Sequence, residues 1–115
     1  MKKVISVHEY ALKPGVDPAQ FERAVLEARA SGLLDLPGLE DCYLLKGIRG
    51  ERRGAYTAVW VYESKAAWEA LWGPEGKPLP KTQYPHNWKI WEDQVLAPFL
   101  EQDPDKIAFT SYQEL

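Results

Sequence analysis

Residues 43–64, YLLKGIRGERRGAYTAVWVYES, hold two apolar runs on either side of a short charged segment with three glycines. Apolar strands separated by a glycine-containing reversal are typical of a β-hairpin. The side chains of the second arm alternate between two faces, and neither face is polar: Tyr56, Ala58, Trp60 and Tyr62 on one, and Ala55, Thr57, Val59 and Val61 on the other. Because a half-solvated strand has one polar face, we predict that helices cover one side and a second copy of the chain the other.

Length and composition predict one compact domain spanning residues 1–115. Hydrophobic residues make up 45% and charged residues 27%, which excludes a wholly disordered chain. No apolar run is long enough for a signal peptide or a membrane span, so a cytoplasmic protein without a membrane partner is expected. The single cysteine, Cys42, is expected to be a small buried residue. One asparagine, one methionine and nine prolines are a composition typical of thermophiles.

The net charge of −3 argues against a nucleic-acid partner, because such binding rests on clustered Lys and Arg. The charge is uneven. The hairpin tip carries +3 and the rest of the chain −6, the tip charges being Lys46, Arg49, Arg52 and Arg53 against Glu51. An RNA recognition motif has the same strand order, but it needs aromatic residues at the positions that Ala55 and Thr57 occupy. No nucleic-acid partner is therefore predicted.

Before the hairpin, the alternating pattern of residues 3–12 predicts a strand that stops at Pro14-Gly15. Asp17 is a suitable N-cap for a helix whose first residue is Pro18, and Gly32 suits its C-terminal end. The apolar residues of that helix repeat at helical spacing, so one of its faces packs on the core.

After the hairpin, Ser64 can cap a short helix that ends at Gly73-Pro74. Residues 73–87 contain four prolines and are predicted to be neither helix interior nor strand. Helical spacing resumes at Trp88 and should end near Pro98, and residues 106–114 alternate as a last strand.

This order of elements, β-α-β-β-α-β with one extra helix, predicts an α+β fold. It is the ferredoxin-like split βαβ arrangement, a four-stranded antiparallel sheet with helices on one face. The other face would expose a large apolar patch on a monomer. A two-fold homodimer with sheets face to face, a dimeric α+β barrel, removes that exposure because it needs only one self-complementary surface.

Three stretches resemble a known family: HEYALKPGVDPAQFERAV at residues 8–25, LPGLEDCYLLKG at 36–47 and VWVYESKAAWEALW at 59–72. Together they resemble the dimeric α+β barrel superfamily, and within it the small proteins of the antibiotic-biosynthesis monooxygenase type. The resemblance implies one of several activities, among them cofactor-free oxygenation of aromatic polyketides, haem degradation and lactone isomerisation. Haem-degrading members have asparagine where this chain has His8 and tryptophan where it has Leu71, so no haem, and no other cofactor, is expected.

The candidate site is a mostly apolar pocket whose polar end forms where His8 and Tyr10 of the first strand meet Trp60 and Tyr62 of the hairpin's second arm. A neutral His8 is a candidate catalytic base because its unperturbed pKa lies near the working pH. The alternative is a histidine hydrogen-bonded to a neighbouring carbonyl or tyrosine. The candidate substrate-binding residues are aromatic or lie near the proline-rich segment: Tyr10, Trp60, Tyr62, Trp72, Tyr84 and His86.

Packing offers an alternative for most of these features. The tryptophans at helical spacing suit a core, and the hairpin arginines suit either a solvated tip or a clamp for an anion or a partner's carboxylates. Two histidines without a spaced acidic partner predict no metal site. Residues 73–87 are either a lid over the cavity or a surface cover.

Two function classes therefore remain open from the sequence. One is a cofactor-free monooxygenase or isomerase that acts on a small aromatic substrate. The other is a non-catalytic ligand-binding or assembly module.

Overall fold

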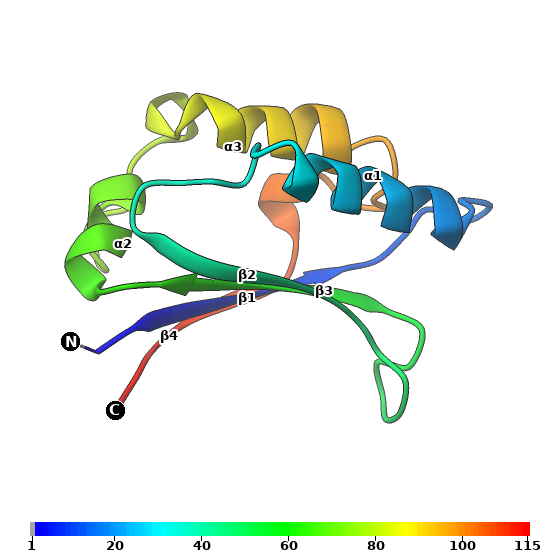
Figure 1. Ribbon diagram of the computed structural model, residues 1–115, viewed down its shortest axis with the longest axis horizontal. Coiled ribbons are helices and arrows are strands. Elements are labelled where there is room, and N and C mark those ends of the chain that lie inside the picture. The colour runs from blue at the N-terminus through cyan, green and yellow to red at the C-terminus, as the bar shows by residue number, and fades with distance from the viewer. Residues whose placement is uncertain (1) are drawn as a thin grey trace.

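The protein, described at residues 2–115 by a computed structural model, has one four-stranded antiparallel sheet with a layer of helices on one face (Figure 1). The strands are β1 (Val4–Tyr10), β2 (Leu39–Lys46), β3 (Tyr56–Tyr62) and β4 (Phe109–Gln113). Their order across the sheet is β2-β3-β1-β4, which is the predicted ferredoxin-like topology. The predicted fold class and the predicted hairpin of β2 and β3 are thus confirmed.

The first two helices begin directly after the residues that were predicted to cap them. The side chain of Asp17 accepts a hydrogen bond of 3.0 Å from the Ala19 N–H at the start of α1 (Pro18–Ala30). The Ser64 hydroxyl accepts one of 3.1 Å from the Ala67 N–H at the start of α2 (Lys65–Trp72). α3 (His86–Ile90) continues directly into a π-helical segment, Trp91–Leu96.

The C-terminal third differs in detail from the prediction. The last helix begins at His86, because Pro85 leads directly into it, and its second half has the wider π-helical turn rather than an α-helical one. The last strand begins at Phe109 rather than at residue 106, because Pro104–Lys106 form a short 3₁₀ turn. The proline-rich segment also contains one such turn, Lys81–Gln83.

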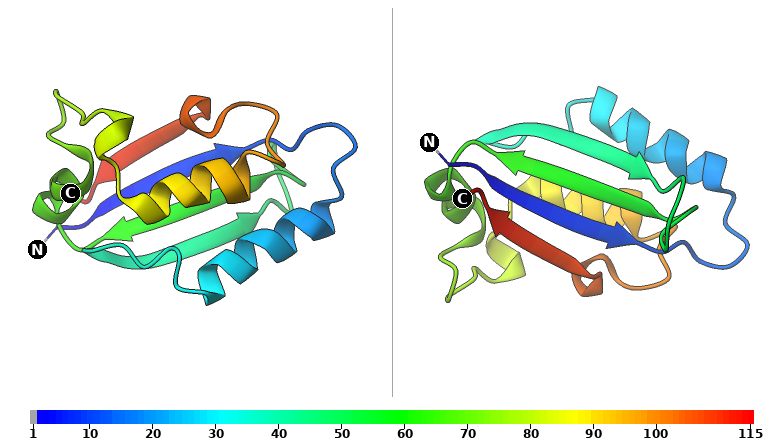
Figure 2. Two further views of the ribbon diagram at one scale, coloured as in Figure 1. Left: turned by 90° about the horizontal axis from the view of Figure 1, so that it is seen from above. Right: turned by 90° about the horizontal axis from the view of Figure 1, so that it is seen from below.

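The core lies between the sheet and the helices, which cover only one sheet face (Figure 2). The even-numbered residues of β3 face the helices and are buried, and Trp60 is completely enclosed. β1 lies between β3 and β4, with His8 opposite Ala58 on one side and Phe109 on the other. Among residues 2–115, no helix is both long and apolar enough to cross a membrane.

No helix within residues 2–115 covers the opposite face, which is visible from below in Figure 2. Its central residues are the apolar side chains of β1 and β3, which are only partly buried: Ile5, Val7, Val59 and Val61. Tyr43, Leu45 and Tyr112 flank them and are about half exposed. We call this surface the open face.

Candidate functional site

His8 lies at the centre of the sheet, enclosed by aromatic rings. Its ring centre is 5.8 Å from that of Trp60, 5.9 Å from Trp88 and 5.6 Å from Phe109. Burial lowers the pKa of the imidazole to about 4, so it is neutral at pH 7. Phe109, on the edge strand β4, is itself 62% exposed and is the outermost of the three rings.

The other aromatic candidates on the sheet fill the core. The Trp60 ring is 5.0 Å from Trp88 and 5.9 Å from Trp91. The Trp72 indole N–H donates a 3.2 Å hydrogen bond to the Tyr62 hydroxyl, which joins α2 to β3. His8 and Trp60 are therefore neighbours, as the sequence suggested, but their rings pack against each other as part of the core.

The proline-rich segment contacts α2 at the same end of the core. The Leu79 N–H donates to the Trp72 carbonyl at 2.8 Å, and the Tyr84 ring packs edge-on against the Trp72 ring at 5.1 Å. His86 is exposed at the first residue of α3. None of residues 73–87 lines any of the three hollows described below.

One hollow lies between α1 and the β2–β3 side of the sheet. Its volume is about 110 Å³, and most of its lining is apolar. Tyr10 is the only predicted site residue that lines it. The remaining lining residues come from α1 and from the strands β2 and β3: Phe21, Glu22, Val25, Leu26, Leu44, Leu45, Lys46, Tyr56 and Thr57.

Three polar side chains converge at this hollow. The Tyr56 hydroxyl donates a short hydrogen bond to Glu22, and the Lys46 ammonium lies 3.4 Å from the same carboxylate. The hydrogen bond from Tyr56, with Lys46 nearby, holds the pKa of Glu22 below its usual value. Burial, together with the Glu22 carboxylate, raises the pKa of Tyr56 to about 12. At pH 7 the group is therefore an ionised carboxylate between a neutral phenol and an ammonium.

Two further hollows are shaped differently. One of about 380 Å³ is a groove between α1 and the π-helical segment, and Ala28, Leu33, Val95 and Phe99 contribute to its walls. The other, of about 170 Å³, lies at the end of β1 beside Arg52. His8 lines none of the three hollows.

One carboxylate is buried away from these hollows. Glu92, in the π-helical segment, is 5% exposed, and burial raises its pKa. The Lys81 ammonium lies 3.8 Å from it and 3.5 Å from Asp93. Lys81 belongs to the proline-rich segment, so this contact ties that segment to the helix.

Within residues 2–115, no group of three or more His, Cys, Asp or Glu side chains is arranged to hold a metal ion. Cys42 is free and buried, and burial raises the pKa of its thiol to about 12.

Sequence reasoning missed most of the hollow beside α1. Glu22, Lys46 and Tyr56 are far apart in the sequence, and each alone looks like an ordinary surface or strand residue. A usable signal was present, because Glu22 borders the apolar face of α1, and an acidic residue there can meet a cation from the sheet.

No protein-family model matches the sequence, and no curated protein matches it significantly. Solved structures do match over nearly the whole chain. A Bordetella bronchiseptica protein provisionally named an antibiotic biosynthesis monooxygenase is 15% identical, with a TM-score of 0.64 over 100% of this chain and 99% of the other. A dimeric ferredoxin-like protein of unknown function from Thermobifida fusca is 12% identical, with a TM-score of 0.57 over 99% and 92%.

The structure of SnoaB, a cofactor-independent oxygenase from Streptomyces nogalater, is also similar. It is 14% identical, with a TM-score of 0.56 over 97% of this chain and 92% of SnoaB. At such identities a likeness establishes the fold alone. The chain therefore has the ferredoxin-like fold of dimeric and antibiotic-biosynthesis-monooxygenase-like proteins, as its sequence resemblance implied.

Proposed function

We propose that this protein is a homodimeric binding module for a small apolar or aromatic molecule, and that the hollow between α1 and the sheet is the binding site. The observation that carries the proposal is a mostly apolar hollow with a few convergent polar groups. That combination is the usual design of a small-molecule site. The base that an enzyme would need, His8, lies outside this hollow.

The volume limits the ligand. A cavity of roughly 150 Å³ lined by aliphatic and aromatic side chains binds one benzene molecule, and this hollow measures about 110 Å³. One six-membered ring or a short branched alkyl group therefore approaches the limit of the site. The hollow is half open to solvent, so the remainder of a larger ligand would lie outside it.

The polar groups indicate the kind of substituent that the ligand carries. Glu22 is ionised and already accepts from Tyr56 and Lys46, and a carboxylate has acceptor capacity for a further donor. A ligand hydroxyl or amine is a suitable donor. A ligand carboxylate would face repulsion from Glu22, so neutral phenols and alcohols are the preferred class.

Thermal stability in the presence of ligand tests this site. Because a ligand that binds only the folded state raises stability in proportion to the logarithm of its concentration, phenol and 4-cresol should raise Tm, whereas benzoate should not. Leu44→Trp fills the hollow and should abolish the shift. Leu33→Trp makes the same change in the groove beside the π-helical segment, and this variant should keep the ligand-induced shift in Tm. A phenol-induced shift that survives in Leu44→Trp would refute the proposed site.

A second copy of the chain is the proposed partner of the open face. This face combines the four central apolar side chains of β1 and β3 with three half-exposed large side chains from β2 and β4. Such a patch on one flat surface is characteristic of an interface. A face-to-face two-fold dimer buries it with a single self-complementary surface.

The second candidate is a cofactor-free monooxygenase or isomerase with His8 as the base. One observation favours it, the fold likeness to a cofactor-independent oxygenase. His8 is neutral and lies beside an exposed ring, Phe109, that a substrate could displace, but a pKa of about 4 makes its imidazole a weak base at neutral pH. Oxygen consumption or isomerisation that is lost in His8→Gln and kept in His86→Gln would favour this candidate over a binding module.

A further inference from the structure

The hairpin tip, residues 47–55, leaves the plane of the sheet on the side away from the helices, at the end of the molecule opposite both termini (Figure 1). At this tip Ile48 is 85% exposed, and Arg49 and Arg53 are also exposed. Neither arginine has an ion-pair partner among the described residues. We call residues 47–55 the arm.

Backbone hydrogen bonds and one ion pair fix the conformation of the arm. The Gly47 N–H donates to the Ala55 carbonyl and the Gly54 N–H to the Gly47 carbonyl, both at 2.8 Å. Gly47 is required for this close approach, because a Cβ atom there would lie 2.0 Å from the Arg52 carbonyl oxygen. Arg52 folds back onto the sheet, 3.1 Å from Glu9. Arg49 and Arg53 therefore lie at the end of an arm with a fixed conformation, where their guanidinium groups can pair with carboxylates of another molecule.

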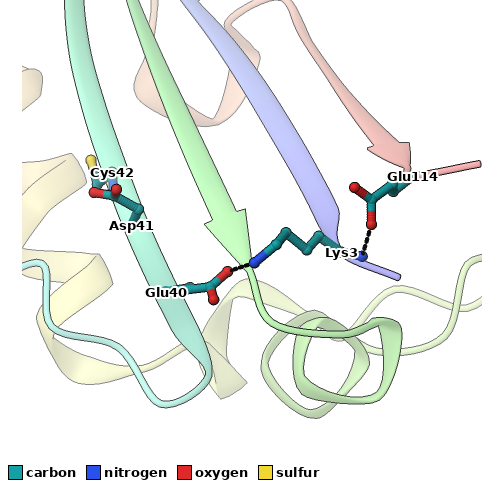
Figure 3. Close-up of polar contacts among 5 residues, drawn as sticks. All are labelled: Lys3, Glu40, Asp41, Cys42 and Glu114. Atoms are coloured by element: carbon teal, nitrogen blue, oxygen red, sulfur yellow. Dashed lines mark hydrogen bonds and ion pairs between the residues drawn. The ribbon is translucent and has the colours of Figure 1, made fainter. Parts of the chain in front are cut away.

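The opposite end of the sheet is acidic. Four exposed carboxylates lie in or directly beside the strands there, against Lys2 and Lys3: Glu40, Asp41, Glu63 and Glu114. Lys3 is already engaged, since its ammonium pairs with Glu40 across the sheet and its backbone N–H donates to Glu114 (Figure 3). The sheet thus has a cationic arm at one end and more carboxylates than ammonium groups at the other, where Glu40 is paired with Lys3 and Asp41 accepts from the Cys42 N–H.

Building on the homodimer proposed above, we infer that the two copies pack antiparallel, so that the arm of each copy lies on the acidic end of its partner. A two-fold axis in the interface plane allows two arrangements of facing sheets: it either brings the two arms together or separates them. Arms that meet would collide, because both project toward the interface, and would bring four exposed arginines together against only two Glu51 carboxylates.

Antiparallel packing replaces that repulsion with attraction. β3 has seven residues, so the arms would be about 23 Å apart at 3.3 Å per residue. That distance is well beyond the screening length of about 8 Å at physiological ionic strength. Each arm would instead face carboxylates of the partner, with Ile48 contacting the rim of the shared apolar interface.

The dimer dissociation constant, measured by sedimentation equilibrium, tests this inference because the two arrangements predict opposite signs. In the antiparallel dimer, Arg49→Ala with Arg53→Ala should weaken association by about tenfold, and added salt should reduce the difference. Where arms meet, the same pair of substitutions would tighten the dimer. Lys13→Ala with Arg23→Ala removes the same charge from exposed positions elsewhere and is the control.

Charge reversal provides the second measurement. Arg49→Glu with Arg53→Glu should weaken the dimer further, and adding Glu63→Arg with Glu114→Arg should restore it. Unchanged or tighter association of the neutralised arm, or no restoration by the reversed acidic end, would overturn the inference. A wild-type protein of 13.1 kDa at every concentration would instead refute the dimer itself.

Discussion

At the scale of single residues, burial decides the protonation state of His8. Its imidazole has lost water to three aromatic rings, and its pKa falls to about 4 from a usual value of 6.5. The unfolded chain therefore binds a proton at a pH at which the folded chain does not. By linkage, stability falls as the pH drops from 6.5 toward 4 and is unaffected by this group above 6.5.

We predict that His8→Gln flattens this pH dependence. A shift of that size corresponds to roughly 3 kcal/mol between pH 7 and pH 4. Denaturant unfolding at both pH values gives the free energy of unfolding of wild type and variant. In the difference between the two proteins, the contributions of carboxylates that titrate in the same range cancel. His86→Gln removes the exposed histidine and should keep the wild-type slope. Equal slopes for wild type and His8→Gln would contradict the assigned burial.

At the scale of elements, one partly buried ion pair connects the proline-rich segment to the last helix. Glu92 is almost fully enclosed, whereas Lys81 is 40% exposed and also reaches Asp93. Prolines restrict the unfolded chain, so the segment loses less entropy on ordering. The pair therefore holds an already restricted segment in place, in keeping with an ordered cover.

We predict that Lys81→Met destabilises the protein by about 1 to 3 kcal/mol, because it leaves a buried carboxylate without its cation. Adding Glu92→Met should recover most of the loss, since an apolar side chain has no charge to compensate. Lys65→Met breaks an exposed pair with Glu75 and should change stability by at most about 1 kcal/mol. Denaturation midpoints of the four proteins measure this, and a double variant as unstable as Lys81→Met would contradict it.

At the scale of the whole molecule, the two sheet faces have different partners. Helices bury the face that contains Trp60, so a charge at Trp60 would disrupt the fold of the subunit itself. The odd-numbered residues of β3 face away from the helices and remain partly accessible. Substitutions on the open face can therefore separate association from folding.

We predict that Val59→Glu gives a folded monomer of 13.1 kDa. The carboxylate would be buried unpaired at the centre of the proposed interface, whereas in the monomer it remains hydrated. Sedimentation gives the mass and circular dichroism the fold. Ala66→Glu, on the exposed side of α2, should stay dimeric. A dimeric Val59→Glu protein would mean that the open face is not the interface.

Local signals in the sequence were enough to predict the elements and their order. Asp17 and Ser64 cap the helices they were expected to cap, and the glycines of residues 43–64 turn the chain between β2 and β3. These signals are local: a capping side chain or a turn glycine acts within a few residues of itself. The π-helical turns of Trp91–Leu96 begin without a side-chain cap, so no local signal of this kind marks them.

The position of the hollows between the elements, in contrast, depends on how distant segments pack. His8, Trp60 and Trp72 were expected beside a cavity, yet neighbouring rings fill the volume around them. The hollow lies instead where Glu22 of α1 meets Tyr56 of β3, 34 residues away along the chain. The physical reason is that a hollow is the volume left over when side chains from distant segments pack, and no periodicity within one segment records how closely another segment approaches it.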